Sequence, residues 1–173
     1  MSRLFYAVVL TISIVLPAKA QEVVGDDRVS GNVGAGIGLE YGGIGIRVSG
    51  PIAKHFALFG GVGHNTLDIA LAGGLSYEPL LKGTIRPEVI AMVGANNVVT
   101  DAGDFHPRYE RTYYGASVGA GIHYYVGSND NFINIKAVYP IATFHYKEVM
   151  DDAVGVKSIP FYFSVGFHLD LGD

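Results

Sequence analysis

The chain has 173 residues, a net charge of −4 at pH 7 and 24 glycines spread along its length. The length suits one domain, and the acidic balance excludes nucleic acid as an expected partner. There is no cysteine, so a fold in an oxidising compartment has to be stable without disulfides. A complete hydrogen-bonded framework or a well-packed core must supply that stability.

Residues 1–20 have the three parts of a secretory signal peptide. Arg3 gives a positive start, residues 4–16 are almost entirely apolar, and Ala18-Lys19-Ala20 matches a small-residue cleavage site. The apolar stretch is shorter than the ~18 residues that a transmembrane helix needs. We therefore expect export and cleavage after Ala20, which leaves ten basic against sixteen acidic residues in the mature chain.

Apolar residues alternate with small or polar residues through most of the chain after a short segment, 21–28, that we expect in the periplasm. Glycines inside these runs are typical of bends and barrel corners. Eight strands are predicted, over residues 29–41, 43–50, 56–64, 67–77, 84–96, 113–125, 132–146 and 158–171. Pro51 is expected to end the second strand, because proline has no N–H for a strand ladder. The sequence therefore predicts an all-β, eight-stranded antiparallel up-and-down barrel over residues 29–171.

The two faces of these strands differ in polarity. One is almost free of charge, and the other carries glycines together with Glu40, Arg47, Asp68, Arg86, Glu88, Lys136 and Asp170. A membrane barrel turns its aliphatic face to lipid, whereas a soluble lipocalin-like barrel turns it inward around a ligand. The charged face is too polar for a ligand-binding calyx, so we predict a transmembrane barrel and keep a periplasmic lipocalin-like barrel as the alternative.

Aromatic residues near the strand ends fit the interfacial girdles of a membrane barrel. They are Tyr41, Tyr77, Tyr124, Tyr139, Phe144, Tyr146 and Phe161. The charges of the polar face are interpreted as a structural ion-pair network, since eight strands enclose an interior that side chains just fill. A narrow porin-like channel is the alternative.

The lengths of the connections agree with both termini lying on the periplasmic side. The short turns 51–55, 78–83 and 127–131 would be periplasmic, and the long connections 97–112 and 147–157 would face outward. The predicted outer contact surface consists of Asp101, Asp104, His106, Arg108, Arg111, Asp151 and Asp152. These acids lack a fixed ligand spacing, so we expect no metal or other cofactor. Basic residues of the same loops would meet lipopolysaccharide phosphates.

A signal peptide, eight alternating strands and the aromatics Phe161, Phe163 and Phe167 of the last strand resemble the small outer-membrane barrels of the OmpA and OmpX type. The resemblance implies residence in the outer membrane and insertion by the barrel assembly machinery. In that family the last strand commonly ends in an aromatic residue, whereas Leu171 stands here and two residues follow it. We expect a monomer in contact with outer-membrane lipid and lipopolysaccharide.

Ser164, His168 and Asp170 share one face of the last predicted strand, and His123 is inward on the sixth. Residues i and i+4 of a strand are about 13 Å apart, which is too far for a nucleophile and its base. No outward His and Ser pair resembles the site of the lipid A deacylase barrels. No catalytic residue is therefore predicted. We expect a structural or surface-interaction role; the alternatives are a narrow porin-like channel, a lipid A-modifying enzyme and a periplasmic lipocalin-like ligand-binding barrel.

Overall fold

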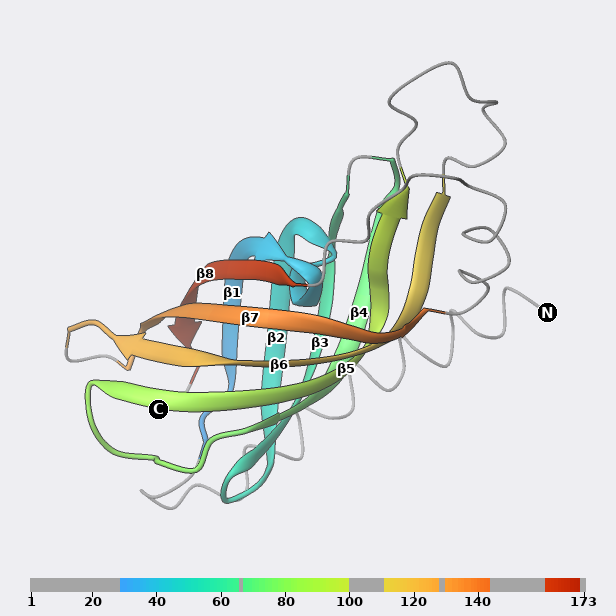
Figure 1. Cartoon of the computed structure of the whole chain (residues 1–173). Coiled ribbons are helices and arrows are strands. Elements are labelled where there is room, and N and C mark those ends of the chain that lie inside the picture. Colours follow the sequence, from blue (N-terminus) through green and yellow to red (C-terminus); the bar gives the residue numbers. More distant parts are fainter. Residues whose placement is uncertain (1–28, 66, 100–110, 128–129, 144–160, 172–173) are drawn as a thin grey trace.

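The computed structural model describes residues 29–65, 67–99, 111–127, 130–143 and 161–171. The chain forms a closed barrel in which each antiparallel strand pairs with its neighbours in sequence (Figure 1). The strands are β1 (Asn32–Gly38), β2 (Gly43–Ala53), β3 (Phe56–His64), β4 (Ile69–Tyr77), β5 (Ile85–Val99), β6 (Arg111–Tyr125), β7 (Phe132–Thr143) and β8 (Tyr162–Asp170). The predicted eight-stranded up-and-down architecture is confirmed. The predicted signal peptide and the segment 21–28 lie outside the described residues.

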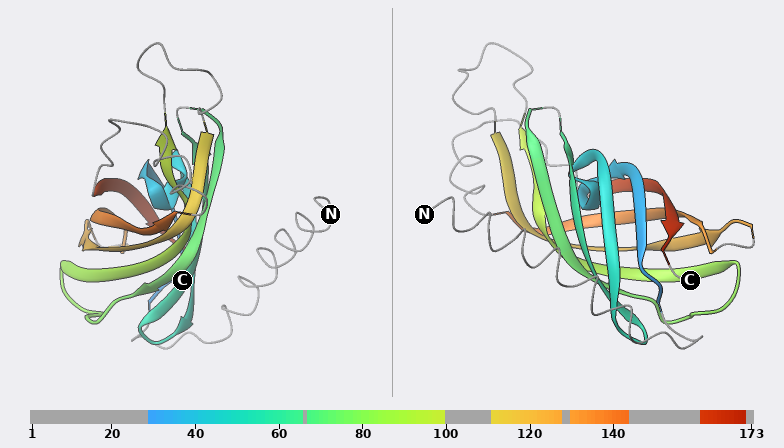
Figure 2. Two further views of the ribbon diagram at one scale, coloured as in Figure 1. Left: turned by 45° about the vertical axis from the view of Figure 1, so that its right-hand side comes forward. Right: turned by 180° about the vertical axis from the view of Figure 1, so that it is seen from behind.

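The first and last strands close the barrel. β1 and β8 lie side by side in the views of Figures 1 and 2, with Asn32 opposite Asp170 and Ile37 opposite Val165. The β2–β3, β4–β5 and β6–β7 connections lie at the barrel end that also holds residues 29 and 171, here called the turn end. The opposite end, here called the loop end, receives the other four connections. Closure leaves no strand edge unpaired along the registers of β1 and β8.

The outer surface of the barrel is apolar. Every strand contributes exposed aliphatic or aromatic side chains, among them Ile37, Ile46, Val62, Ile69, Leu71, Val93, Val118, Ile135, Phe163 and Phe167. Phe163 is 79% exposed and Ile69 is 69% exposed. Alternation along each strand places these side chains outside and their sequence neighbours inside.

The interior holds both apolar and polar side chains. Phe59, Ala72, Ile90, Met92 and Val138 form one buried apolar cluster. Ile90 and Met92 share the strand parity of Glu88, and all three are buried inside the barrel. The interior is therefore a packed core of mixed chemistry.

The chain departs from the predicted first strand at Gly38. Residues Leu39–Tyr41 form a 3-10 helix, η1, that interrupts the expected strand 29–41. Tyr41 is completely buried, so its predicted place in an aromatic girdle is wrong. Within the described residues no helix is long and apolar enough to cross a membrane.

The ends of the other strands also differ from prediction by a few residues, and those of β2 and β4 have a visible cause. β2 continues through Pro51 to Ala53, where the pairing with β3 shifts register, so Pro51 does not end the strand. A bulge accommodates proline because it releases one ladder position. β4 begins at Ile69, and the preceding turn holds Asp68, whose N–H donates to the Asn65 side chain at 2.8 Å.

Candidate functional site: the barrel interior

Residues 38–42, here called the inner turn, fold from the β1–β2 connection into the barrel. Gly38 and Gly42 flank η1 with φ values of 150° and 69°, and the Gly42 N–H donates to the Leu39 carbonyl at 3.1 Å. Such positive φ values favour glycine. η1 contacts β1, β2, β3, β4, β5 and β8, and both Glu40 and Tyr41 are 0% exposed. The inner turn therefore occupies the barrel interior.

Inward-facing glycines make room for the inner turn. A methyl group at any of five of them would collide with the backbone of Glu40 or Tyr41 or with the Tyr41 ring. They are Gly36, Gly45, Gly61, Gly63 and Gly166. These positions come from β1, β2, β3 and β8, so the glycine-rich face of the sequence forms the wall around this turn.

A cluster of buried charges lies beside the inner turn. The Glu88 carboxylate accepts a hydrogen bond from Arg47 Nη2 at 3.0 Å and pairs with Lys136 Nζ. Glu40 Oε1 lies 3.2 Å from Lys136 Nζ and 3.9 Å from Arg47 Nη1. The Arg47 guanidinium also lies over the Phe59 ring, 4.1 Å from its centroid. All four charged side chains are at most 2% exposed, and each charge faces an opposite one, as a dry interior requires.

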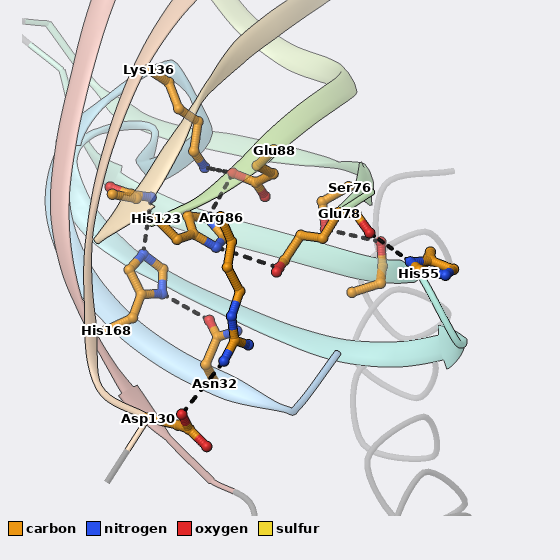
Figure 3. Close-up of polar contacts among 12 residues, drawn as sticks. Asn32, His55, Ser76, Glu78, Arg86, Glu88, His123, Asp130, Lys136 and His168 are labelled. Carbon is orange, nitrogen blue, oxygen red and sulfur yellow. Dashed lines mark hydrogen bonds and ion pairs between the residues drawn. The ribbon is translucent and has the colours of Figure 1, made fainter. Parts of the chain in front are cut away.

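His123 extends this cluster towards the turn end. Its Nε2 donates to Glu88 Oε2 at 2.8 Å, and its Nδ1 lies 3.3 Å from Glu78 Oε1 (Figure 3). Each ring nitrogen of His123 therefore lies beside a glutamate carboxylate, Nε2 beside Glu88 and Nδ1 beside Glu78.

A second polar group surrounds His168 on β8. Its Nε2 contacts the Tyr41 hydroxyl and lies 3.2 Å from Asn134 Nδ2, and its Nδ1 lies 2.7 Å from Asn32 Oδ1. The Phe132 ring lies between the rings of His168 and His123, with centroid distances of 4.6 and 4.2 Å. His168 therefore ties the inner turn to three strands of the wall.

No hydrogen bond joins His168 to Ser164 in the described part of the chain. Both nitrogens of His168 have partners, and none of them is a serine. The Ser164 hydroxyl is buried without a hydrogen-bond partner among the described residues. In the described part of the chain no group of three or more His, Asp or Glu side chains is arranged to hold a metal ion.

Only some of the charged residues that were predicted to lie inside the barrel come together. The structure brings Glu40, Arg47, Glu88 and Lys136 together in the cluster described above. Arg86 lies nearer the turn end, where its guanidinium covers the Tyr125 ring at 3.8 Å and lies 3.7 Å from Asp130. Asp68 and Asp170 lie elsewhere.

Those two acids occupy the two ends of the barrel. Asp68 is exposed in the β3–β4 turn at the loop end, so it does not reach the interior. Asp170 is the last residue of β8, and its N–H donates to Asn131 Oδ1 at 3.1 Å. Strand alternation predicts that both acidic side chains point into the barrel. Asp68, however, precedes β4, so alternation along this strand does not determine the direction of its side chain.

The predicted outer contact residues are not placed by this structure. Asp101, Asp104, His106, Arg108, Asp151 and Asp152 lie outside the described residues. Arg111 is the first residue of β6, and only the backbone of this residue is described.

Several interior residues were missed in the sequence. Glu78 follows β4 and was assigned to a surface turn, yet it is 3% exposed and faces His123. Tyr41 was assigned to the outer face. Phe132 shares the strand parity of Asn134 and Lys136, and this parity was a usable signal. Glu78 likewise continues the strand parity of Ser76, whereas no pattern in the sequence marks the inward direction of Tyr41.

Comparison of the chain with protein-family models, curated proteins and solved structures finds no match.

Proposed function

We propose that the chain is a sealed bacterial outer-membrane barrel with a structural or surface-interaction role and no enzymatic activity. The observation that carries this proposal is the polarity of the closed barrel. Apolar side chains from all eight strands face outward, whereas the buried charges face inward. The proposal includes export by the N-terminal signal and insertion by the barrel assembly machinery.

The physical basis is the difference between water and lipid as surroundings. An exposed apolar patch of a soluble monomer is normally limited to a few hundred Å², whereas a membrane barrel carries such side chains around its whole circumference. A closed strand ladder also satisfies the backbone N–H and C=O groups that lipid cannot. A lipocalin-like carrier is not favoured, because the cavity it needs is occupied by the inner turn and the charge cluster.

Because the interior is filled, a sealed barrel is favoured over an open channel. The inner turn, Phe59 and the Glu88 cluster are buried in the interior and contact one another. Eight strands enclose only enough space for side chains. With the interior closed, contacts to partners or to lipopolysaccharide are assigned to the outer connections 97–112 and 147–157.

Envelope fractionation followed by gel electrophoresis tests the membrane proposal. The full chain is expressed in a Gram-negative host, and the outer-membrane fraction is run with and without boiling. We expect the protein in that fraction, with different migration of the unheated form because a closed barrel resists detergent. Recovery of the protein in the soluble periplasm would contradict the proposal and favour the lipocalin-like alternative.

Conductance across a planar lipid bilayer tests the sealed interior. We expect the inserted protein to give no steady single-channel current, because the inner turn and the ion pairs fill the interior. A reproducible current from the inserted barrel would contradict the structural role and favour a channel function.

A further inference from the structure

The Lys136 amine lies between two buried carboxyl groups of the barrel interior. Its Nζ is 2.5 Å from Glu88 Oε2 and 3.2 Å from Glu40 Oε1, and all three side chains are 0% exposed. Figure 3 shows the Lys136 side chain reaching towards Glu88. Glu40 belongs to the inner turn, whereas Lys136 and Glu88 belong to the strands β7 and β5. This contact therefore joins the element that fills the barrel to the wall around it.

The surroundings of the two carboxyl groups differ. Glu88 accepts a hydrogen bond from Arg47 at 3.0 Å and lies 2.8 Å from His123 Nε2, so its negative charge is stabilised. Among the described residues, neither oxygen of Glu40 has a hydrogen-bond partner, although the carboxyl group faces Lys136 and Arg47. Two carboxyl groups in unlike surroundings take unlike roles. Glu88 is placed to stay ionised, and Glu40 is the one placed to become neutral.

The contact between Lys136 and Glu40 lies in surroundings that disfavour charge. The next inward residues of β5 and β7 are Ile90 and Val138, which are buried in the apolar cluster. Burial away from water penalises an ionised pair, and transfer of a proton from the ammonium to the carboxylate removes both charges. Lys136 then carries a neutral amine with a free electron pair, and Glu40 carries a neutral carboxyl group. These are the two reactants of amide formation.

We propose that Lys136 and Glu40 condense to an amide bond that ties the inner turn to β7, with Glu88 as the general base. Lys136 Nζ attacks the Glu40 carboxyl carbon, which is one C–O bond from the oxygen that Nζ contacts. The bond between Nζ and Cδ forms, the Glu88 carboxylate takes one proton from Nζ, and the C–O bond to the Glu40 hydroxyl breaks. Glu88 passes that proton to the leaving hydroxyl. One water is released, Glu88 is unchanged, and no oxidant or other reactant is consumed.

The fold favours this reaction and gives the bond a role. Gly38 and Gly42 hold η1 with positive φ, and both reacting side chains are fixed by burial. Groups held in contact react at effective concentrations far above those reached in solution. The chain has no cysteine, so an amide supplies the covalent link that a disulfide cannot. It makes the seal of the barrel permanent, and it depends on the interior and not on the membrane location.

Intact mass spectrometry tests for the bond. The full chain is expressed with its signal, purified in the folded form that circular dichroism identifies by its β-sheet spectrum, and then denatured and weighed. We expect a mass about 18 Da below that of the unmodified sequence, the loss of one water. We also expect a tryptic map in which Lys136 is not cleaved and its peptide is joined to that of Glu40.

Two lysine variants assign the loss of mass to this pair. Lys136→Arg keeps the positive charge, but its guanidinium is always protonated and does not attack a carboxyl group, so we expect the unmodified mass. The matched control is Lys54→Arg, which changes an exposed lysine of the β2–β3 turn and is expected to keep the deficit. Each mass is compared with that of its own sequence, so a modification elsewhere in the chain is common to all three proteins and cancels.

Refolding tests the role of Glu88. The mature chain, residues 21–173, is refolded from urea, and the deficit is followed with time in the folded fraction alone. We expect Glu88→Gln to form the bond at least about 100-fold more slowly than the wild type, because a general base contributes about 10²–10⁴-fold to such a step. Counting only folded protein separates this effect from a loss of stability. Equal rates would overturn the assignment of Glu88 as the base.

The outcomes separate the cross-link from the membrane proposal. Folded wild-type protein of unmodified mass would overturn the inference, because the contact would then be an ion pair only. A deficit that persists in Lys136→Arg would also overturn it, since the lost water would come from another site. An outer-membrane barrel of unmodified mass keeps the proposed function and refutes the cross-link, whereas a cross-linked protein in the soluble periplasm keeps the cross-link and refutes the proposed function.

Discussion

Glu88 is the carboxylate on which the interior cations converge. It contacts Arg47, His123 and Lys136, and its side chain is completely buried. Removing one member of a buried charge group is costly, because the remaining charges lose their compensation while they stay out of water. The energetic weight of the interior is therefore concentrated at this residue.

We expect Glu88→Gln to lower the free energy of unfolding by about 3 kcal/mol. Urea unfolding of the protein in lipid vesicles, followed by the heat-dependent gel shift, measures this change. The matched control is Asp68→Asn, which removes the same charge from an exposed turn and is expected to change stability by less than about 0.5 kcal/mol. Similar effects of the two variants would show that water reaches the Glu88 cluster.

The direction of single side chains was predictable only within regular strands. Arg47, Glu88 and Lys136 were assigned inward by alternation, and all three are buried. The same rule misplaced Tyr41 and Asp68, since both stand where the chain has left the strand. Alternation predicts the direction of a side chain only while the backbone remains extended. The end of a strand is less clear from the sequence than its middle.

At the scale of elements, the inner turn depends on the glycines that face it. Gly61 of β3 faces inward, and a methyl group there would collide with the Glu40 carbonyl oxygen. Gly60, the preceding residue, has no heavy atom within 4 Å of such a group. Two adjacent residues of one strand thus offer a comparison of the inner and outer surfaces of the barrel wall.

We expect Gly61→Ala to lower the free energy of unfolding by about 1–3 kcal/mol, because the added methyl group overpacks the inner turn. Gly60→Ala is expected to leave it within about 0.5 kcal/mol of the wild type. Urea unfolding in vesicles measures both variants. Equal stability of the two would mean that the inner turn does not occupy the interior, and the sealed barrel would lose its main support.

Strand order was more predictable than strand ends. The number of strands and their antiparallel order follow from periodic alternation and from the polar connections between the strands. The 3-10 helix at Leu39–Tyr41 was not predictable, because its stability comes from contacts with several distant strands rather than from local sequence. The glycines of β1, β2, β3 and β8 are evident in the sequence. That they all face the inner turn is evident only in the closed barrel.

At the scale of the whole molecule, the outward and inward faces of the closed barrel are exchanged relative to a soluble protein. Val118 lies in the middle of β6, is 38% exposed and pairs with Ala91 and Tyr139 on the neighbouring strands. Val126 is also exposed, 43%, but it lies just beyond the end of the same strand. The two valines differ in their position along the barrel axis and not in residue type or exposure.

This pair distinguishes lipid from water as the surroundings of the barrel. In lipid, we expect Val118→Arg to cost about 2–4 kcal/mol of unfolding free energy, because a charge near the middle of the bilayer is expensive. Val126→Arg is expected to cost at most about 1 kcal/mol, since the polar interface accepts the guanidinium. Urea unfolding in phosphatidylcholine vesicles gives both values. Equal and small costs would place the β6 surface in water, because an exposed arginine on a soluble strand leaves stability almost unchanged.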